Sequence, residues 1–77
     1  MSEAKILDVK GLNCPQPIVK AKKTLQSDVA VGGLLEVHAT DPGARDDFAS
    51  FCRSTGHELV EQKEDAGTYI FLIRRKK

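Results

Sequence analysis

The run Gly11-Leu12-Asn13-Cys14-Pro15-Gln16-Pro17 constrains the fold of this chain more than any other segment. Proline is tolerated in the first turn of a helix, because the N–H group that it lacks would have no helical partner there, and it favours extended dihedrals in the preceding residue. A short apolar segment, Ile6 to Val9, precedes the run, and an amphipathic segment, Pro15 to Leu25, follows it. The run therefore predicts a turn from a strand into a helix, with Cys14 as the N-cap.

The amphipathic segment has helical spacing, followed by a strand pattern. Its apolar face consists of Ile18, Ala21 and Leu25, and its polar face of Gln16, Lys20, Lys23 and Ser27. Gly32-Gly33 ends this periodicity. The next residues alternate between apolar and polar, as in a strand with one buried face and one face toward water: Leu35, Val37 and Ala39 against Glu36, His38 and Thr40.

A second helix is predicted after Asp41-Pro42-Gly43, with Asp41 as the N-cap and Pro42 at the first helical position. Gly56 suits the residue just past the end of this helix, whose buried stripe consists of Ala44, Phe48, Phe51 and Cys52. The remaining segments read as a polar strand, a turn and an apolar strand: Glu58 to Lys63, Asp65-Ala66-Gly67 and Tyr69 to Ile73.

This order of elements, βαβαββ, predicts an α+β fold. We expect a two-layer sandwich in which two helices pack on one face of a four-stranded mixed sheet. The first strand, first helix and second strand should form a right-handed parallel crossover. Residues 1–77 leave room for one domain only. Cys14 then lies on the surface at an edge of the sheet, and Gly11 lets the backbone turn sharply beside it.

A position at a helix N-terminus has consequences for the Cys14 thiol. Pro15 and Pro17 have no N–H group, which leaves the Gln16 N–H free and within reach of the Cys14 sulfur. This donor and the positive end of the helix dipole both favour the thiolate. An unperturbed cysteine, with a pKa of about 8.5, is only a few per cent thiolate at pH 7. The other interpretation is that Cys14 is a small buried hydrophobic residue, as most free cysteines are.

Other features limit the environment and the cofactors. Met1 to Lys5 has no apolar signal core, and no apolar run is long enough to span a membrane, so we expect a cytoplasmic protein without membrane attachment. In that reducing compartment a Cys14 to Cys52 disulfide is not expected. A metal site built from Cys14, His38, Cys52 and His57 would lack paired-ligand spacing, and no metal or other cofactor is expected.

The residues resemble those of the SirA/TusA family of small sulfur-carrier proteins. The resemblance rests on Leu7-Asp8-x-x-Gly11-Leu12-x-Cys14-Pro15-x-Pro17, then on the Asp41-Pro42 helix start, and more weakly on Phe51-Cys52, Gly56-His57 and Ile73-Arg74. It covers nearly the whole chain, and the Cys-Pro-x-Pro motif after Gly-Leu-x is its specific part. The family's fold is the βαβαββ sandwich predicted above.

The resemblance implies that Cys14 accepts a sulfane sulfur as a persulfide, with Gly11, Pro15, Gln16 and Pro17 as supporting residues. The donor would be a cysteine desulfurase or a rhodanese-type sulfurtransferase, and the acceptor another protein. Such relays serve 2-thiouridine formation in transfer RNA, sulfur oxidation or other sulfur trafficking, and the motif does not choose between them. The chain would then be a monomeric carrier within a protein relay rather than a stand-alone enzyme, without direct contact to nucleic acid.

Two rival classes remain open. A thiol-disulfide redox protein would require a resolving cysteine near Cys14, and Cys-x-x-Cys is absent. A nucleic-acid-binding regulatory module could use the lysines and the basic tail, but the net charge of +1 and the lack of tryptophan argue against it. Acyl-transfer chemistry would need a histidine base, and we expect His38 and His57 to be surface residues away from Cys14.

Partners are expected to dock beside Cys14. On a helical wheel Val19 falls on a flank between the apolar face and the stripe formed by Lys20 and Lys23. An exposed apolar residue rimmed by lysines has the composition of a small transient interface, although Val19 could also merely border the core. The basic tail, Arg74 to Lys77, is expected to be solvated and frayed.

Overall fold

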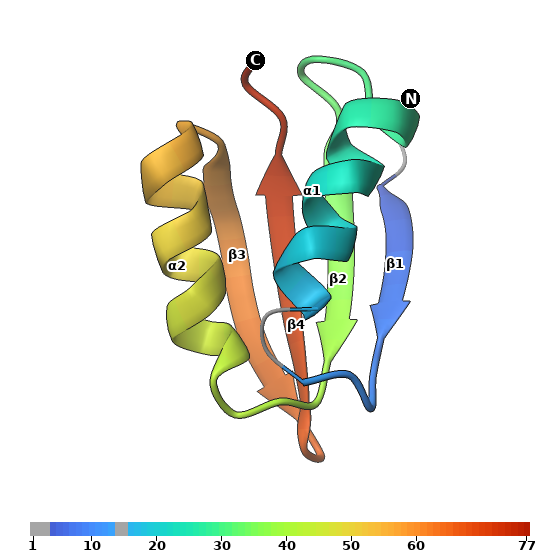
Figure 1. Cartoon of the computed structure of the whole chain (residues 1–77), viewed down its shortest axis with the longest axis vertical. Helices are drawn as coiled ribbons and strands as arrows, with labels where there is room; N and C mark the ends of the chain where they lie inside the picture. The colour runs from blue at the N-terminus through green and yellow to red at the C-terminus, as the bar shows by residue number, and fades with distance from the viewer. Residues whose placement is uncertain (1–3, 14–15) are drawn as a thin grey trace.

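The computed structural model describes residues 4–13 and 16–77. Its elements are β1 (Lys5–Val9), α1 (Gln16–Asp28), β2 (Leu34–Ala39), α2 (Ala44–Thr55), β3 (Glu58–Asp65) and β4 (Thr68–Arg74). Both helices lie on the same face of a single sheet (Figure 1), which confirms the predicted βαβαββ two-layer sandwich. In the part of the chain that is described, neither helix is long and apolar enough to cross a membrane.

The sheet is mixed, with the strand order β1-β2-β4-β3. β1 and β2 are parallel, as the crossover required, whereas β4 pairs antiparallel with both β2 and β3. β4 is therefore an inner strand, and β1 and β3 form the edges. β3 carries an irregularity between Leu59 and Glu61 and many charged side chains, features that discourage pairing with another chain at a sheet edge.

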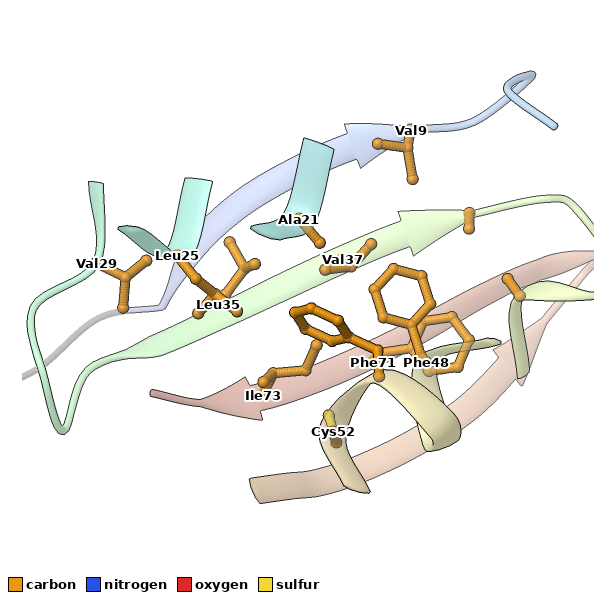
Figure 2. Packing of buried hydrophobic residues seen from close by; sticks show 13 residues of the cluster. Val9, Ala21, Leu25, Val29, Leu35, Val37, Phe48, Cys52, Phe71 and Ile73 are labelled. Atoms are coloured by element: carbon orange, nitrogen blue, oxygen red, sulfur yellow. The ribbon is translucent and has the colours of Figure 1, made fainter. Parts of the chain in front are cut away.

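The core lies between the helices and one face of the sheet (Figure 2). Leu35, Val37 and Ala39 of β2 are fully buried, which confirms the alternation predicted for this strand. Phe48 of α2 stacks on Phe71 of β4, with ring centroids 4.7 Å apart and an interplanar angle of 24°. The predicted stripe of α2 is likewise buried: Ala44, Phe48, Phe51 and Cys52.

The first turn of α1 packs differently from the prediction. The helix ends at Asp28, three residues beyond the expected Leu25, and its buried residues are Pro17, Ala21 and Leu25. These residues follow one another at intervals of four and form a single stripe against the sheet. Ile18 lies on the flank of this stripe and is only partly buried. Ile18 therefore packs against the core together with Ala21 and Leu25, as expected, but Pro17 is the fully buried residue of the first turn.

The start of α2 also differs from the prediction. The N-cap is Gly43 rather than Asp41, and Ala44 rather than Pro42 is the first helical residue. Asp41 instead closes the turn before the helix, because its Oδ1 accepts the Gly43 N–H at 3.2 Å and its carbonyl accepts the Ala44 N–H at 2.9 Å. The predicted C-terminus is confirmed, since Gly56 adopts a φ of 85° and donates its N–H to the Cys52 carbonyl.

The C-terminal residues are docked onto the fold, so the expectation of a frayed tail was wrong. Arg75 donates its backbone N–H to the Gly33 carbonyl at 2.9 Å, and its own carbonyl accepts the Gly32 N–H at 2.7 Å. Its guanidinium Nη1 donates to the Val29 carbonyl at 2.6 Å, just beyond the end of α1. Lys76 donates its backbone N–H to His57 Nδ1 at 3.1 Å. The tail thus continues the line of β4 and joins the ends of both helices.

Candidate functional site

Three connections meet at one end of the molecule (the lower end in Figure 1): the β1–α1 loop, the β2–α2 loop and the β3–β4 hairpin. Because β1 and β2 are parallel, their carboxyl ends lie at the same end of the sheet, and the loops that follow them are neighbours. Gly11 donates its backbone N–H to Thr40 Oγ1 at 2.9 Å, which ties these two loops together. The start of β1 and the C-terminus lie at the opposite end.

The β1–α1 loop turns sharply directly after β1. Asp8 Oδ1 accepts the Lys10 N–H at 3.0 Å, and the Val9 carbonyl accepts the Leu12 N–H at 3.2 Å. Gly11 has a φ of 83°, a left-handed conformation that residues with a Cβ atom seldom adopt. The sharp turn expected at Gly11 is therefore present. Leu12 is partly buried and packs against the core, which anchors the loop to the rest of the fold.

Cys14 and Pro15, and with them the predicted N-cap, lie outside the described residues. The residues on either side are held together, because Gln16 donates its backbone N–H to the Asn13 carbonyl at 2.9 Å. The sequence predicted that this N–H is free and within reach of the Cys14 sulfur; it is not free, because the Asn13 carbonyl accepts it. Of the two features expected to favour a Cys14 thiolate, the positive end of the α1 dipole is the one that remains.

The outer surface of α1 is basic and has one apolar residue in its first turns. Val19 is 48% exposed, so it lies at the surface rather than in the core. Lys20 and Lys23 are also exposed, as is Lys22 between them. None of these three lysines has an ion pair with any residue in the described ranges. We call Val19, Lys20 and Lys23 the α1 patch; Pro17, two positions before Val19, fixes the first turn of the helix in the core.

The second cysteine is unsuited to nucleophilic chemistry. Cys52 is a free cysteine that is 5% exposed, in the core beside Phe48 (Figure 2). Burial raises the pKa of its thiol from 9.0 to about 11, because the charged form would lose its hydration. At neutral pH Cys52 is therefore a protonated thiol, and the prediction that it belongs to the core is confirmed.

The two histidines lie apart from one another, and the ring of each has a hydrogen-bond partner. His38 Nε2 is 2.6 Å from Glu36 Oε2, on the face of the sheet that the helices leave open. His57 lies after α2, at the end of the molecule opposite to the β1–α1 loop, where it accepts the Lys76 N–H. Both are partly buried rather than fully at the surface as expected. Within residues 4–13 and 16–77, no group of three His, Cys, Asp or Glu side chains could hold a metal ion.

Sequence reasoning missed two residues that shape the site. Thr40 was taken only as a polar residue of a strand, whereas its hydroxyl links the two loops at the site. Pro17 was taken as a helix starter, whereas its ring is also one of the largest fully buried side chains. The second could have been found from the spacing Pro17, Ala21, Leu25; the first depends on a contact between residues 29 positions apart.

Known proteins with similar sequences identify the family. A family model described as sulfurtransferase TusA matches residues 5–75. The sulfur carrier protein TusA of Pseudomonas paraeruginosa (strain DSM 24068 / PA7) is 55% identical over 71 residues, which cover 92% of this chain and 89% of that protein. The protein of the same name from Pseudomonas putida (strain ATCC 700007 / F1) is 51% identical over 71 residues, covering 92% and 88%.

A solved structure agrees with this assignment. The crystal structure of a SirA-like protein from Desulfitobacterium hafniense superimposes with a TM-score of 0.80 at 25% sequence identity and covers 94% of this chain and 97% of that one. The resemblance noted from the Cys-Pro-x-Pro motif is thereby confirmed, for the sequence and for the fold. The chain belongs to the TusA family and is a sulfur carrier protein of the TusA type.

Proposed function

We propose that Cys14 is the residue on which this carrier holds sulfur, as a persulfide that it receives from one protein and delivers to another. The observation that supports this most directly concerns the other cysteine. The chain has two cysteines, and Cys52 is buried with a pKa raised to about 11, so it cannot offer an accessible thiolate at neutral pH. Cys14 is the thiol that remains.

The chemistry requires no cofactor and no net oxidation. The Cys14 thiolate attacks the terminal sulfur of a donor persulfide, the sulfur–sulfur bond of the donor breaks, and the donor thiolate leaves with the bonding electron pair. Delivery repeats this exchange: an acceptor thiolate attacks the outer sulfur, and the Cys14 thiolate leaves. Each step needs an ionised, accessible sulfur more than it needs a base held nearby. The positions of His38 and His57 fit this requirement.

A carrier of sulfur has a donor protein and an acceptor protein as partners. We propose a cysteine desulfurase or a rhodanese-type sulfurtransferase as the donor, and an acceptor in transfer-RNA thiolation or sulfur oxidation. The α1 patch is the proposed docking surface for the donor, because it combines the exposed Val19 with lysines that have no ion pair among the described residues, and because α1 begins directly after the Cys14-Pro15 pair in the sequence.

The delivery half of this cycle can be tested separately from loading. Protein loaded by a persulfide donor is freed of the donor and mixed with an excess of a small acceptor thiol. We expect the added sulfur to leave the protein as a persulfide of the acceptor and Cys14 to become reactive toward alkylation again. Sulfur that stays on the protein under these conditions, although reductant removes it, would contradict a carrier role.

A further inference from the structure

The sheet face that lies away from the helices has a regular pattern of side chains. Leu35, Val37 and Ala39 point toward the helices, so the residues that alternate with them point away. Residues paired across neighbouring strands point to the same side. The register therefore places two central rows on this open face: Ile6, Glu36, Leu72 and Glu61, and then Asp8, His38, Ile70 and Lys63. Leu34, Arg74 and Glu58 form a further row on one side of them, and Thr68 and Asp65 lie on the other.

This open face is not uniformly polar, although the sequence predicted a face toward water. The middle of it is apolar, because the inner strand β4 places Ile70 and Leu72 there, and both are only partly buried. Ile6, in the same row as Leu72, is 61% exposed. An apolar centre with a charged rim is the composition of a protein interface rather than of a plain solvated surface.

A shallow hollow lies over the apolar centre, with a volume of about 30 Å³. Its floor consists of Ile70 and Leu72, and its sides of Glu36, Glu61 and Lys63. Glu61 has no ion pair with any residue in the described part of the chain. Glu36 lies across β4 from it, since both residues are paired with Leu72. The hollow thus presents carboxylates on both sides of an aliphatic floor.

The charge of the open face is opposite to that of α1. Its two central rows hold three carboxylates and one lysine, with His38 bonded to one of the carboxylates. Beyond these rows Glu58 forms an ion pair with Arg74, and Asp65 adds another carboxylate. The surface of α1 carries Lys20, Lys22 and Lys23 and, among the residues of this helix, only Asp28 as an acid. Such a face repels phosphate groups and anionic lipids and attracts a basic partner.

We propose that the open face, centred on Glu36, Glu61, Ile70 and Leu72, is a second docking surface, for a basic amphipathic segment of a partner protein. A lysine or arginine of that segment would lay its aliphatic stem on Ile70 and Leu72 and place its cationic head between Glu36 and Glu61. Because α1 lies on the other side of the sheet, this partner and one bound at α1 can be held together. The proposal does not depend on the role of Cys14.

The probe is a synthetic amphipathic helical peptide of leucine, alanine and lysine, titrated into ¹⁵N-labelled protein and followed through backbone amide shifts. We expect shifts on the open face, at β2, β3 and β4, and no binding of a matched peptide with glutamate in place of lysine. Glu61→Lys should weaken binding by about fivefold or more, the effect of about 1 kcal/mol. Glu64→Lys is the matched control, since it makes the same charge change on the same strand beside Tyr69, on the helix side.

Equal losses of affinity in the Glu61→Lys and Glu64→Lys proteins would overturn the proposal, because they would show an effect of net charge alone. Shifts confined to α1, or equal binding of the two peptides, would overturn it as well. Sedimentation velocity tests whether a second copy of this chain binds the open face instead. Dimers that Glu61→Lys abolishes would show that the open face binds a second copy of this chain, and would overturn the assignment to a different partner.

Discussion

The backbone N–H of Gly11 donates a hydrogen bond to the hydroxyl oxygen of Thr40, 29 positions along the chain, at 2.9 Å. Gly11 belongs to the loop that leads into the Cys-Pro-x-Pro motif, and Thr40 follows directly after β2. This bond couples the position of the loop to the sheet and to the start of α2. The loop is therefore fixed by a long-range contact as well as by the local turn at Gly11.

Replacing Thr40 tests this coupling. Thr40→Val keeps the shape of the side chain but removes the acceptor, and we expect it to lower the free energy of unfolding by about 1 kcal/mol or less, since the bond is exposed to solvent. Thr40→Ser keeps the hydroxyl and is the matched control. Urea unfolding of the two variants measures the difference. Wild-type stability of Thr40→Val would show that the hydrogen bond does not contribute.

Cys52 gives a prediction for stability at neutral pH. Cys52→Ala removes a buried sulfur next to Phe48, and we expect it to lower the free energy of unfolding by roughly 1 kcal/mol, a usual cost for a small core deletion. Sulfur loading should remain complete in this variant. Loss of loading in a folded Cys52→Ala protein would instead make Cys52 a relay or resolving thiol and would favour the redox class.

The raised pKa of Cys52 adds a dependence on pH. Between the ordinary value of 9.0 and the folded value of about 11, the unfolded thiol has lost its proton and the folded thiol has kept it. The unfolded state binds fewer protons in this range, so the folded state loses stability as the pH rises. Cys52→Ala lacks this contribution. The difference in free energy of unfolding between the wild-type protein and Cys52→Ala should therefore become smaller as the pH rises above 9. A constant difference would contradict the burial of the thiol.

His57 predicts the opposite dependence at low pH. Burial lowers its pKa below the ordinary value of 6.5, and the charges of Arg75 and Lys77 lower it further. The unfolded state therefore binds a proton just below pH 6.5 that the folded state does not, and stability falls as the pH falls through this range. His57→Asn retains an acceptor for the Lys76 N–H but does not titrate. Unfolding curves recorded from pH 7.5 to pH 5 should show a shallower loss in this variant; parallel losses would exclude His57 as the cause.

The α1 patch predicts effects on transfer between proteins rather than on thiol chemistry. Val19→Glu should slow sulfur transfer from the cognate donor by about fivefold or more, because it places a charge in the apolar part of the interface. Lys20→Glu should act in the same direction and more strongly at low salt, since salt screens exposed charges. Reaction with a small thiol reagent should be unchanged in both.

Lys63→Glu, the same charge change on β3, serves as the control for donor transfer. Equal slowing by Lys63→Glu and Lys20→Glu would show that net charge, and not the α1 patch, governs the encounter. Transfer at the wild-type rate in Val19→Glu and Lys20→Glu would mean that the donor approaches Cys14 from another side.

Periodicity and turn residues were enough to predict the fold. Strict alternation in Leu35 to Thr40 and the stripe from Ala44 to Cys52 each have one physical interpretation, so the strand, the helix and their buried faces followed directly. Positions at element ends were harder. Asp41-Pro42 resembles a helix start, but the Asp41 side chain can close a turn equally well, and the choice depends on the path of the chain after β2.

Long-range hydrogen bonds could not be predicted in this way. The docked tail depends on Arg75 meeting Gly33 and Val29, which lie far away in sequence and become neighbours only through the sheet order. The use of the Gln16 N–H by the Asn13 carbonyl depends on the detailed dihedrals of a turn, which residue types alone do not determine. The motif indicated the chemistry of the site, whereas the contacts that support the motif follow only from the three-dimensional structure.

The central claim, that Cys14 holds the transferred sulfur, is tested most directly by intact-protein mass spectrometry after incubation with a persulfide donor. The wild-type protein and Cys52→Ala should each gain the mass of one sulfur atom, in a form that reductant removes, and Cys14→Ser should gain none. Undiminished loading of a folded Cys14→Ser protein would contradict the account.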